Sequence, residues 1–214
     1  MRILKKVFIY CLGLFFLAVG VTFSIKSRLG ISPVNSIPYI ISLITGIEQG
    51  HVIIVIFSIF ILIQILLLRK NFKARNLLQI IFSTVFGYFV TFSNFIFSFP
   101  SPENYLIRLL LLLVSMTLIS IGIILYLRAN ILPMPPEGLM LAIQVVTKKE
   151  FHRVKSVVDT LFVMTATALA LIFLGGFVGV REGTVIAAVF IGKIMGLIEK
   201  RFKKQIDALV RFMA

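Results

Sequence analysis

Cysteine, histidine and acidic residues are scarce in this chain of 214 residues, which has one cysteine, two histidines and eight aspartates or glutamates. The single Cys11 cannot form a disulfide within the chain, and these few residues provide no metal-binding set. The sequence also lacks a Ser-His-Asp order, an HExxH motif, a Gly-rich phosphate loop and a catalytic pair of carboxylates. We therefore expect no enzyme activity and no cofactor.

Apolar residues are abundant instead, since 59% of the chain is hydrophobic and only 14% is charged. A soluble domain of this size has too little interior to bury so much apolar surface. Runs of about 20 apolar residues match the hydrocarbon thickness of a bilayer. We predict a single all-α membrane domain over residues 1–214 with six transmembrane helices, at Val7–Ile25, Val52–Leu68, Leu77–Phe97, Leu106–Leu127, Val157–Leu174 and Thr184–Ile198. The first run is too long for a signal peptide and lacks a small-residue cleavage site, so we expect it to be retained.

The net charge of +14 is distributed along the chain in a way that indicates topology rather than nucleic-acid binding. Of the 22 lysines and arginines, 17 form four clusters at alternate ends of the predicted spans: Arg2/Lys5/Lys6, Arg69/Lys70/Lys73/Arg75, Arg128/Lys148/Lys149/Arg153/Lys155 and Lys200/Arg201/Lys203/Lys204/Arg211. Positive charge in short loops stays cytoplasmic. Both termini are therefore expected in the cytoplasm, with the lipid bilayer as a partner and no nucleic acid.

The order of features repeats along the chain. Pro135 lies 102 residues after Pro33, and Gly122 lies 102 residues after Gly20. Each proline follows a long apolar run and a cation, and opens a shorter apolar stretch. Three predicted spans in each half reverse the orientation of the second half, so the repeats at about 1–100 and about 101–214 would form inverted three-helix repeats.

The two proline-led segments, residues 31–46 and 133–147, are apolar but too short to cross a bilayer. We predict two short helices that start at Pro33 and at Pro135 or Pro136, because proline suits the first turn of a helix. Pro38 could kink the first of them. Both helices could be re-entrant, which would imply a central site, or could lie flat at the two membrane surfaces.

Two cations occupy equivalent places in the repeat, Lys26 and Arg128. One interpretation is that they and the N-termini of the two short helices converge on an anionic site. The alternative is that each side chain extends to lipid headgroups at the end of its span.

Three ionisable residues of the second half are further candidates. Glu137, next to Gly138 in the proline-led segment, could bind a cation or couple proton movement, or could be an exposed residue at a helix start. Lys155 and Asp159 are four residues apart and so share one face of a helix. The three could form a binding cluster, or Lys155 and Asp159 could form a structural ion pair that fixes helix packing.

The remaining polar candidates are structural as much as functional. Thr184 or Glu182 could cap the last predicted span, and Gly183 allows a close approach of a neighbouring backbone or a ligand. A tight loop between helices explains most of this motif. Gln64, Gln79 and Asn94 are expected to hydrogen-bond between helices.

The stretches that carry a family resemblance span nearly the whole chain: residues 30–33, 38–42, 64–72, 78–80, 135–138, 179–184 and 192–193, with the single residues Gly50, Phe151, Lys155 and Asp159. In these stretches the chain resembles the YczE/YyaS/YitT group of bacterial integral membrane proteins, and most of all its YczE-like branch. The resemblance implies a multi-pass protein of the bacterial cytoplasmic membrane. It supports four residues as motif positions without assigning them roles: Glu137, Lys155, Asp159 and Gly183. An acidic residue expected after the glycine of the third span is absent, and Phe89 and Thr91 stand near that place.

Two classes of function are consistent with this pattern. The first is a transporter of a small solute or ion that works by alternating access, with the proline-led segments as its gate. The second is a protein without transport activity of its own, either an accessory or scaffold protein or the substrate-binding subunit of a larger transporter. A homo-oligomer or an accessory partner is consistent with both classes. A stable copurifying partner would favour the second class.

Overall fold

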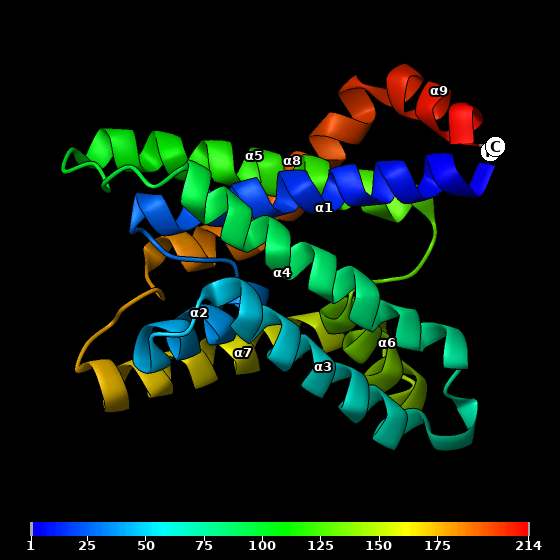
Figure 1. The fold of residues 1–214 in the computed structure, drawn as a ribbon, viewed down its shortest axis with the longest axis horizontal. Helices are drawn as coiled ribbons and strands as arrows, with labels where there is room; N and C mark the ends of the chain where they lie inside the picture. Colours follow the sequence, from blue (N-terminus) through cyan, green and yellow to red (C-terminus); the bar gives the residue numbers. More distant parts are fainter. Residues whose placement is uncertain (1, 214) are drawn as a thin grey trace. The chain divides into compact units, whose positions relative to one another are not determined.

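The computed structural model describes residues 2–213, and of Met213 only the backbone. It consists of helices joined by short connections, with no strand among the described residues (Figure 1). The helices are α1 (Arg2–Ser27), α2 (Pro33–Thr45), α3 (Gln49–Leu68), α4 (Gln79–Ile96), α5 (Tyr105–Ala129), α6 (Pro135–Thr147), α7 (Phe151–Leu174), α8 (Glu182–Arg201) and α9 (Lys203–Met213). Two 3₁₀ turns, η1 (Arg69–Asn71) and η2 (Ala74–Leu78), connect α3 to α4. The predicted all-α class is therefore confirmed.

Five helical stretches are long and apolar enough to cross a membrane. They cover Arg2–Ser27, Gln49–Asn71, Ala74–Ile96, Tyr105–Ala129 and Phe151–Leu174. They correspond to the first five predicted spans, of which the third was predicted to end one residue later, at Phe97. The sixth predicted span lies in α8, which has 20 residues but carries Lys193 in its middle and Glu199, Lys200 and Arg201 at its end. These charges set α8 apart from the other five.

The two short helices begin where the prolines predict. α2 starts at Pro33 and α6 at Pro135, and each has 13 residues. At 1.5 Å per residue each helix is about 20 Å long, which is too short for a hydrocarbon layer of about 30 Å. α2 continues through Pro38 as one helix to Thr45.

The chain divides into two compact units, each of which takes segments from both halves of the sequence. Unit 1 contains residues 1–32, 89–131 and 181–214, and unit 2 contains residues 33–88 and 132–180. The boundary between residues 88 and 89 falls inside α4. The units are thus not the two predicted sequence repeats.

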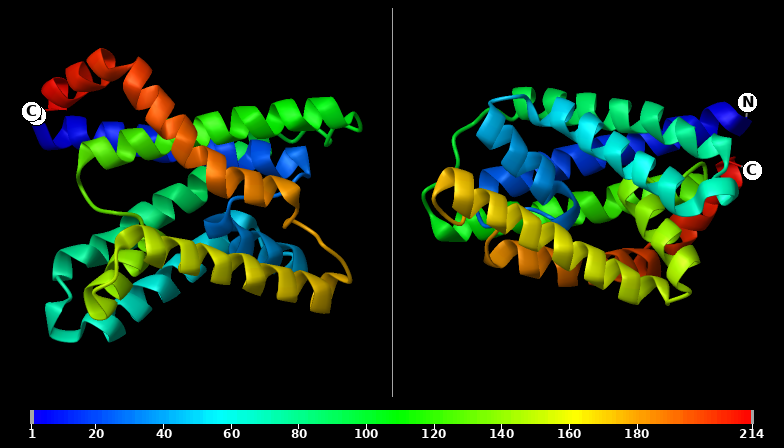
Figure 2. Two further views of the ribbon diagram at one scale, coloured as in Figure 1. Left: turned by 180° about the vertical axis from the view of Figure 1, so that it is seen from behind. Right: turned by 90° about the horizontal axis from the view of Figure 1, so that it is seen from below.

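Unit 1 is built on a close crossing of α1 and α5, which lie side by side in both Figure 1 and Figure 2. A Cβ atom at Gly122 would lie 2.6 Å from the Gly13 carbonyl oxygen and 2.7 Å from the Leu17 nitrogen. A Cβ atom at Gly20 would lie 2.9 Å from the Ile119 nitrogen. The two backbones therefore touch, and the order of the contacts shows that the helices are antiparallel.

α8 and the second half of α4 complete unit 1. α8 packs on α5 through a cluster of Leu29, Leu112, Met116 and Ala187. The end of α4 follows α1, since Phe89 meets Phe15 and Phe97 meets Phe23 with ring centroids 5.6 and 5.0 Å apart. Between these aromatic contacts, the Thr22 hydroxyl donates to the Asn94 side-chain oxygen at 2.7 Å. The predicted interhelical role of Asn94 is confirmed.

In unit 2, each short helix packs against a long helix from the other half of the sequence. α2 lies against α7, and α6 lies against α3. The contact of α2 with α7 centres on Ile40, which is buried with Ala166, Ala170 and Val180. Alanine on α7 leaves room for a close approach of α2, as is usual where helices pack in a membrane.

A row of four aromatic rings joins three helices of unit 2. Phe86 of α4 stacks on Phe57 of α3, Phe57 on Phe60, and Phe60 on Phe162 of α7, with centroids 6.0, 5.9 and 5.1 Å apart. α3 and α7 run in opposite directions (Figures 1 and 2). The stack therefore fixes the register of these two antiparallel helices.

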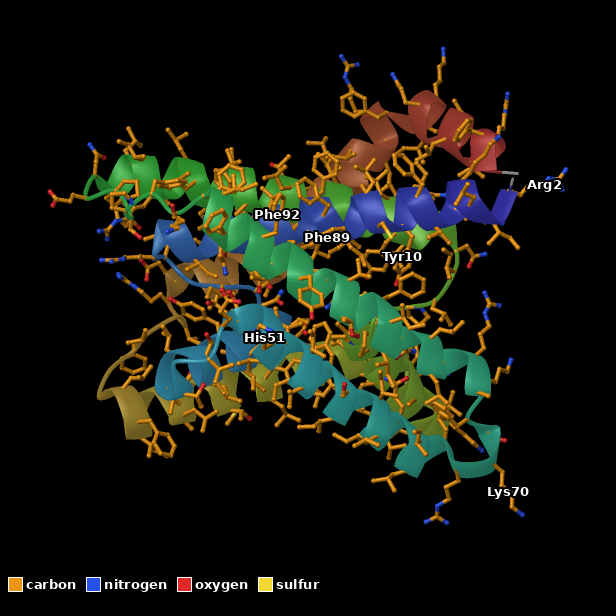
Figure 3. All side chains as sticks on the ribbon, in the orientation of Figure 1. Arg2, Tyr10, His51, Lys70, Phe89 and Phe92 are labelled. Carbon is orange, nitrogen blue, oxygen red and sulfur yellow. The ribbon has the colours of Figure 1, made fainter. Side chains whose placement is uncertain are left out.

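Large apolar side chains remain exposed along the outer faces of the long helices, for example Val55, Leu62 and Leu66 on α3. Such a surface suits lipid rather than water. Figure 3 shows His51 in the first turn of α3 and Lys70 in η1, just after the end of α3, so that the apolar stretch of this helix lies between them.

We predict that Gly122→Ala destabilises the protein by about 1–3 kcal/mol, because the new methyl group would enter the space of the α1 backbone. The free energy of unfolding in detergent micelles measures the effect. Gly192→Ala is the matched control, since a Cβ atom at this helical glycine of α8 has no described atom within 4 Å. Equal stability of the two variants would contradict the close crossing.

Candidate functional site

Polar groups gather in unit 2 around the start of α6. Pro135 and Pro136 occupy the first two positions of this helix, after Met134 in an extended conformation. The first N–H groups of a helix usually offer hydrogen bonds to an anion, but proline has no N–H. Gly138 N donates to Met134 O at 2.8 Å, which leaves at most the Glu137 N–H. The start of α6 thus presents a carboxylate and few donors, which suits a cation better than an anion.

Two buried glutamines fasten this helix start to α3 and α4. Gln64 Nε2 donates to Gln79 Oε1 at 3.1 Å and to the Pro135 carbonyl oxygen at 3.2 Å. Gln79 Nε2 donates back to Gln64 Oε1 at 3.4 Å. The prediction that these side chains bond between helices is confirmed. Their contact with the backbone of α6 was not predicted, because sequence patterns do not show which helices are neighbours.

Gly138 lies directly against this pair of amides. A Cβ atom there would come within 2.6 Å of Gln64 Oε1 and 2.9 Å of Gln79 Nε2. A side chain at this position would displace the amides from their hydrogen bonds. The glycine of the Pro-Pro-Glu-Gly motif therefore serves the packing of α6 on α3.

Lys155 and Asp159 form an ion pair on α7, with Lys155 Nζ 2.8 Å from Asp159 Oδ2. The side chain of Asp159 is only 16% exposed, whereas that of Lys155 is 47% exposed. The second carboxylate oxygen, Oδ1, is buried and accepts no hydrogen bond from the described residues. Because a buried carboxylate oxygen normally has a donor or a cation beside it, Asp159 has capacity for a further partner.

The register of unit 2 places Asp159 near the depth of the glutamine pair. Phe60 and Phe162 are stacked, Gln64 lies one turn after Phe60, and Asp159 lies about one turn before Phe162. Since α3 and α7 are antiparallel, both steps lead to the same end of the unit, where Gln64 bonds to the start of α6. The structure thus confirms the pair of Lys155 and Asp159 and gathers Glu137 at their end of the unit; direct contact of Glu137 with the pair stays a prediction.

The first short helix resembles α6 in its burial. Pro33 and Pro38 are both buried in α2, together with Asn35 and Ser36. Pro33 O accepts a hydrogen bond from the Ser36 hydroxyl at 2.6 Å. The first turn of α2 thus carries buried polar side chains, but it has no carboxylate to match Glu137.

In unit 1, the connection after α1 is joined to the start of α8. Gly183 N donates to Leu29 O at 2.7 Å, and Ile31 N donates to the Thr184 hydroxyl at 3.2 Å. Gly30 has φ +131°, and a Cβ atom there would lie 2.5 Å from Thr184 Oγ1. Glycine is therefore required at position 30 on both counts. The backbone of residues 29–31 and the start of α8 thus satisfy each other's hydrogen bonds, which favours the structural interpretation of Gly183 and Thr184.

The two repeat-related cations do not meet. Lys26 Nζ lies 5.5 Å from the centre of the Phe99 ring, whereas Arg128 forms an ion pair with Glu199 at 2.6 Å. Both residues lie at the C-terminal ends of their helices, and α1 and α5 are antiparallel. Lys26 and Arg128 are therefore at opposite ends of unit 1 and do not converge on one anion. The partner Glu199 was missed because it is 71 residues away in the sequence.

Comparison with known proteins gives the family. The model of a family of unknown function, DUF6198, matches residues 4–200. The chain belongs to this family. It is also 27% identical, over 187 residues, to the uncharacterized membrane protein YczE of Bacillus subtilis (strain 168). The aligned residues make up 87% of this chain and 81% of YczE. The resemblance to YczE-like membrane proteins is thus confirmed. No solved structure matches the chain.

For the glutamine pair, we predict that Gln64→Leu and Gln79→Leu each destabilise this DUF6198 protein by about 0.6–2 kcal/mol, the range for hydrogen bonds between membrane helices. The double variant should lose less than the sum, because either single substitution already removes the hydrogen bonds between the two amides. Unfolding in detergent micelles measures all three. Gln144→Leu is the control, since this half-buried glutamine of α6 makes no side-chain hydrogen bond among the described residues. Strict additivity would contradict the pairing.

Proposed function

We propose that the protein moves a small solute or ion across the membrane by alternating access. The observation that carries this proposal is a two-fold relation between contacts in unit 1. Gly20 meets Ile119, and Gly122 meets Leu17, while 20 and 122, like 17 and 119, differ by 102. The contact of Gly20 with Ser115 O has the same counterpart in that of Gly122 with Gly13 O. Such relations are expected when two inverted repeats pack about an axis in the membrane plane.

The pairing of helices in unit 2 supports the same relation. An offset of 102 residues takes α2 to α6 and α3 to α7. The contact of α2 with α7 then corresponds to that of α6 with α3, and both pairs occur. Each unit would thus contain its own pair of repeat-related elements. Inverted repeats of this kind are characteristic of secondary transporters, whose sites lie near interrupted helices.

We count α8 as the sixth span of this arrangement. Its end is charged, and the Lys193 ammonium in its middle lies 5.1 Å from the centre of the Phe190 ring. A lysine can reach polar surroundings along its own helix, so one such residue is compatible with a span. The basic clusters would then place both termini in the cytoplasm.

Burial along the short helices favours the re-entrant arrangement over the interfacial one. In α6 the first residues are buried, including Pro135, Pro136 and Gly138, whereas Val145 to Thr147 are exposed. Side-chain exposure in α2 increases in the same direction, from the buried Pro33 to the exposed Thr45. A helix that lay flat at the surface would be buried along one side instead of at one end. Non-helical backbone is tolerated at depth where protein shields it or where it lines a cavity, and Met134, directly before α6, is buried.

In this proposal Glu137 and Asp159 bind the coupling ion or a cationic group of the solute. Both carboxylates belong to the end of unit 2 where α6 begins, and ionisable groups of membrane helices usually mark an ion or solute path. Lys155 would pair with the Asp159 carboxylate until the ion replaces it. The proline-led segments would open and close access, while Lys26 and Arg128 contribute charge at separate ends of unit 1.

The inverted arrangement predicts opposite labelling of two equivalent residues. Ile47 and Lys149 are related by the offset of 102, are both exposed, and follow the ends of α2 and α6. Cys11→Ala removes the only native thiol, so that Ile47→Cys and Lys149→Cys each provide a single site. A membrane-impermeant maleimide should label position 47 in intact cells and position 149 only after permeabilisation. Labelling of both from the same side would contradict the inverted repeat.

The transport step predicts ion-dependent currents from purified protein in proteoliposomes on a solid-supported membrane. A jump of Na⁺, K⁺ or H⁺ should evoke a current, which Glu137→Gln or Asp159→Asn should reduce about tenfold or more, equal to a loss of about 1.4 kcal/mol of ion binding. Glu150→Gln is the control, because this exposed carboxylate at the start of α7 pairs with Arg153 on the surface.

The same current measurements distinguish transport from an accessory or substrate-binding role. Currents that survive in both carboxylate variants would remove Glu137 and Asp159 from the mechanism. No current with any of the three ions, in a folded protein that copurifies with a partner at fixed stoichiometry, would favour an accessory or substrate-binding subunit instead.

A further inference from the structure

The last helix, α9, separates charge from apolar surface. One side of the helix carries Lys203, Asp207 and Arg211 at intervals of four residues, with Lys204 beside them. The other side carries Ile206, Leu209 and Val210. The helix has 11 residues and is about 16 Å long, so it cannot cross a bilayer. A short helix of this pattern, with a basic polar face, is typical of segments that lie in the surface of a membrane.

α9 is attached to the first turns of α1. The Lys5 ammonium donates to the Phe212 carbonyl oxygen at 3.1 Å and lies 4.2 Å from the centre of the Phe212 ring. Both helices belong to unit 1. The two ends of the described chain therefore form one surface, residues 2–8 of α1 with α9, which we name the terminal platform.

The terminal platform combines cations with exposed apolar side chains. It contains six cations and a single carboxylate, Asp207; the cations are Arg2, Lys5, Lys6, Lys203, Lys204 and Arg211. Ile3, Leu4 and Phe8 are exposed on the α1 side, and Val210 is 39% exposed on the α9 side. Cations alone would suit a nucleic acid or a free phosphate, but neither covers apolar surface. A lipid layer suits both features, because its phosphate headgroups pair with the cations and its acyl chains cover the apolar side chains.

We propose that the terminal platform binds anionic phospholipids, with α9 lying flat in the headgroup layer and its apolar side turned toward the acyl chains. Each Lys or Arg near an anionic membrane surface strengthens binding by a factor of about five. Six cations on one surface enrich anionic lipid beside α9 over a zwitterionic lipid present at the same concentration. This site does not depend on whether the protein transports a solute.

The chain has no tryptophan, so one introduced at position 210 is a single fluorescent reporter of the lipids beside α9. The Val210→Trp protein is placed in nanodiscs of phosphatidylcholine and phosphatidylglycerol in equal amounts, where either lipid carries quenching bromine atoms on its acyl chains. We expect brominated phosphatidylglycerol to quench the reporter about twofold more than brominated phosphatidylcholine, because anionic lipid collects at the cations.

Two matched proteins show whether the cations cause this difference. Lys203→Gln, Lys204→Gln and Arg211→Gln, introduced together with Val210→Trp, should bring the two quenching values together. Leu106→Trp reports from the first turn of α5, an exposed position at the far end of unit 1 from α9, and should show no preference. Equal quenching of Trp at position 210 by both lipids would overturn the proposal. Quenching by neither lipid would also overturn it, because α9 would then lie outside the membrane.

Discussion

The contact of two helix backbones at Gly20 and Gly122 is the constraint on which unit 1 depends. Inside a bilayer, apolar side chains gain little by leaving lipid for protein, so helices associate through close packing and hydrogen bonds. Glycine permits this approach because it has no side chain, and here the gaps are below 3 Å for an added Cβ atom. Once α1 and α5 are locked in this way, α8 and the end of α4 pack on a fixed pair.

Unit 2 is held by different means, and its candidate site follows from them. The aromatic row sets the register of α3 and α7, and the paired amides of Gln64 and Gln79 anchor the start of α6. Two prolines then remove the donors that an anion would need at that helix start. As a result, the first turn of α6 carries the Glu137 carboxylate at the same end of unit 2 as Asp159. The cation site that we propose would therefore depend on this packing as well as on charge.

Local patterns predicted much of this architecture. The apolar runs located five long helices, the prolines located the starts of α2 and α6, and four-residue spacing located the pair of Lys155 and Asp159. Contacts between distant segments were beyond reach: hydropathy does not show that α6 meets α3 or that Arg128 meets Glu199. Lys26 and Arg128 show a further limit. One of the two interpretations took equivalence in the predicted repeat to mean proximity, although an antiparallel pair of helices puts equivalent residues at opposite ends.

The interleaving of both halves in each unit has a consequence for biosynthesis. When the first half of the chain has entered the membrane, α1 lacks α5, α2 lacks α7 and α3 lacks α6. Gln64 and Gln79, however, already lie in one helical hairpin and can satisfy each other before α6 is made. The amide pair thus shields two polar side chains from lipid during synthesis. When the second half arrives, Gln64 of this pair donates to the Pro135 carbonyl oxygen, and this hydrogen bond adds to the packing of α3 against α6.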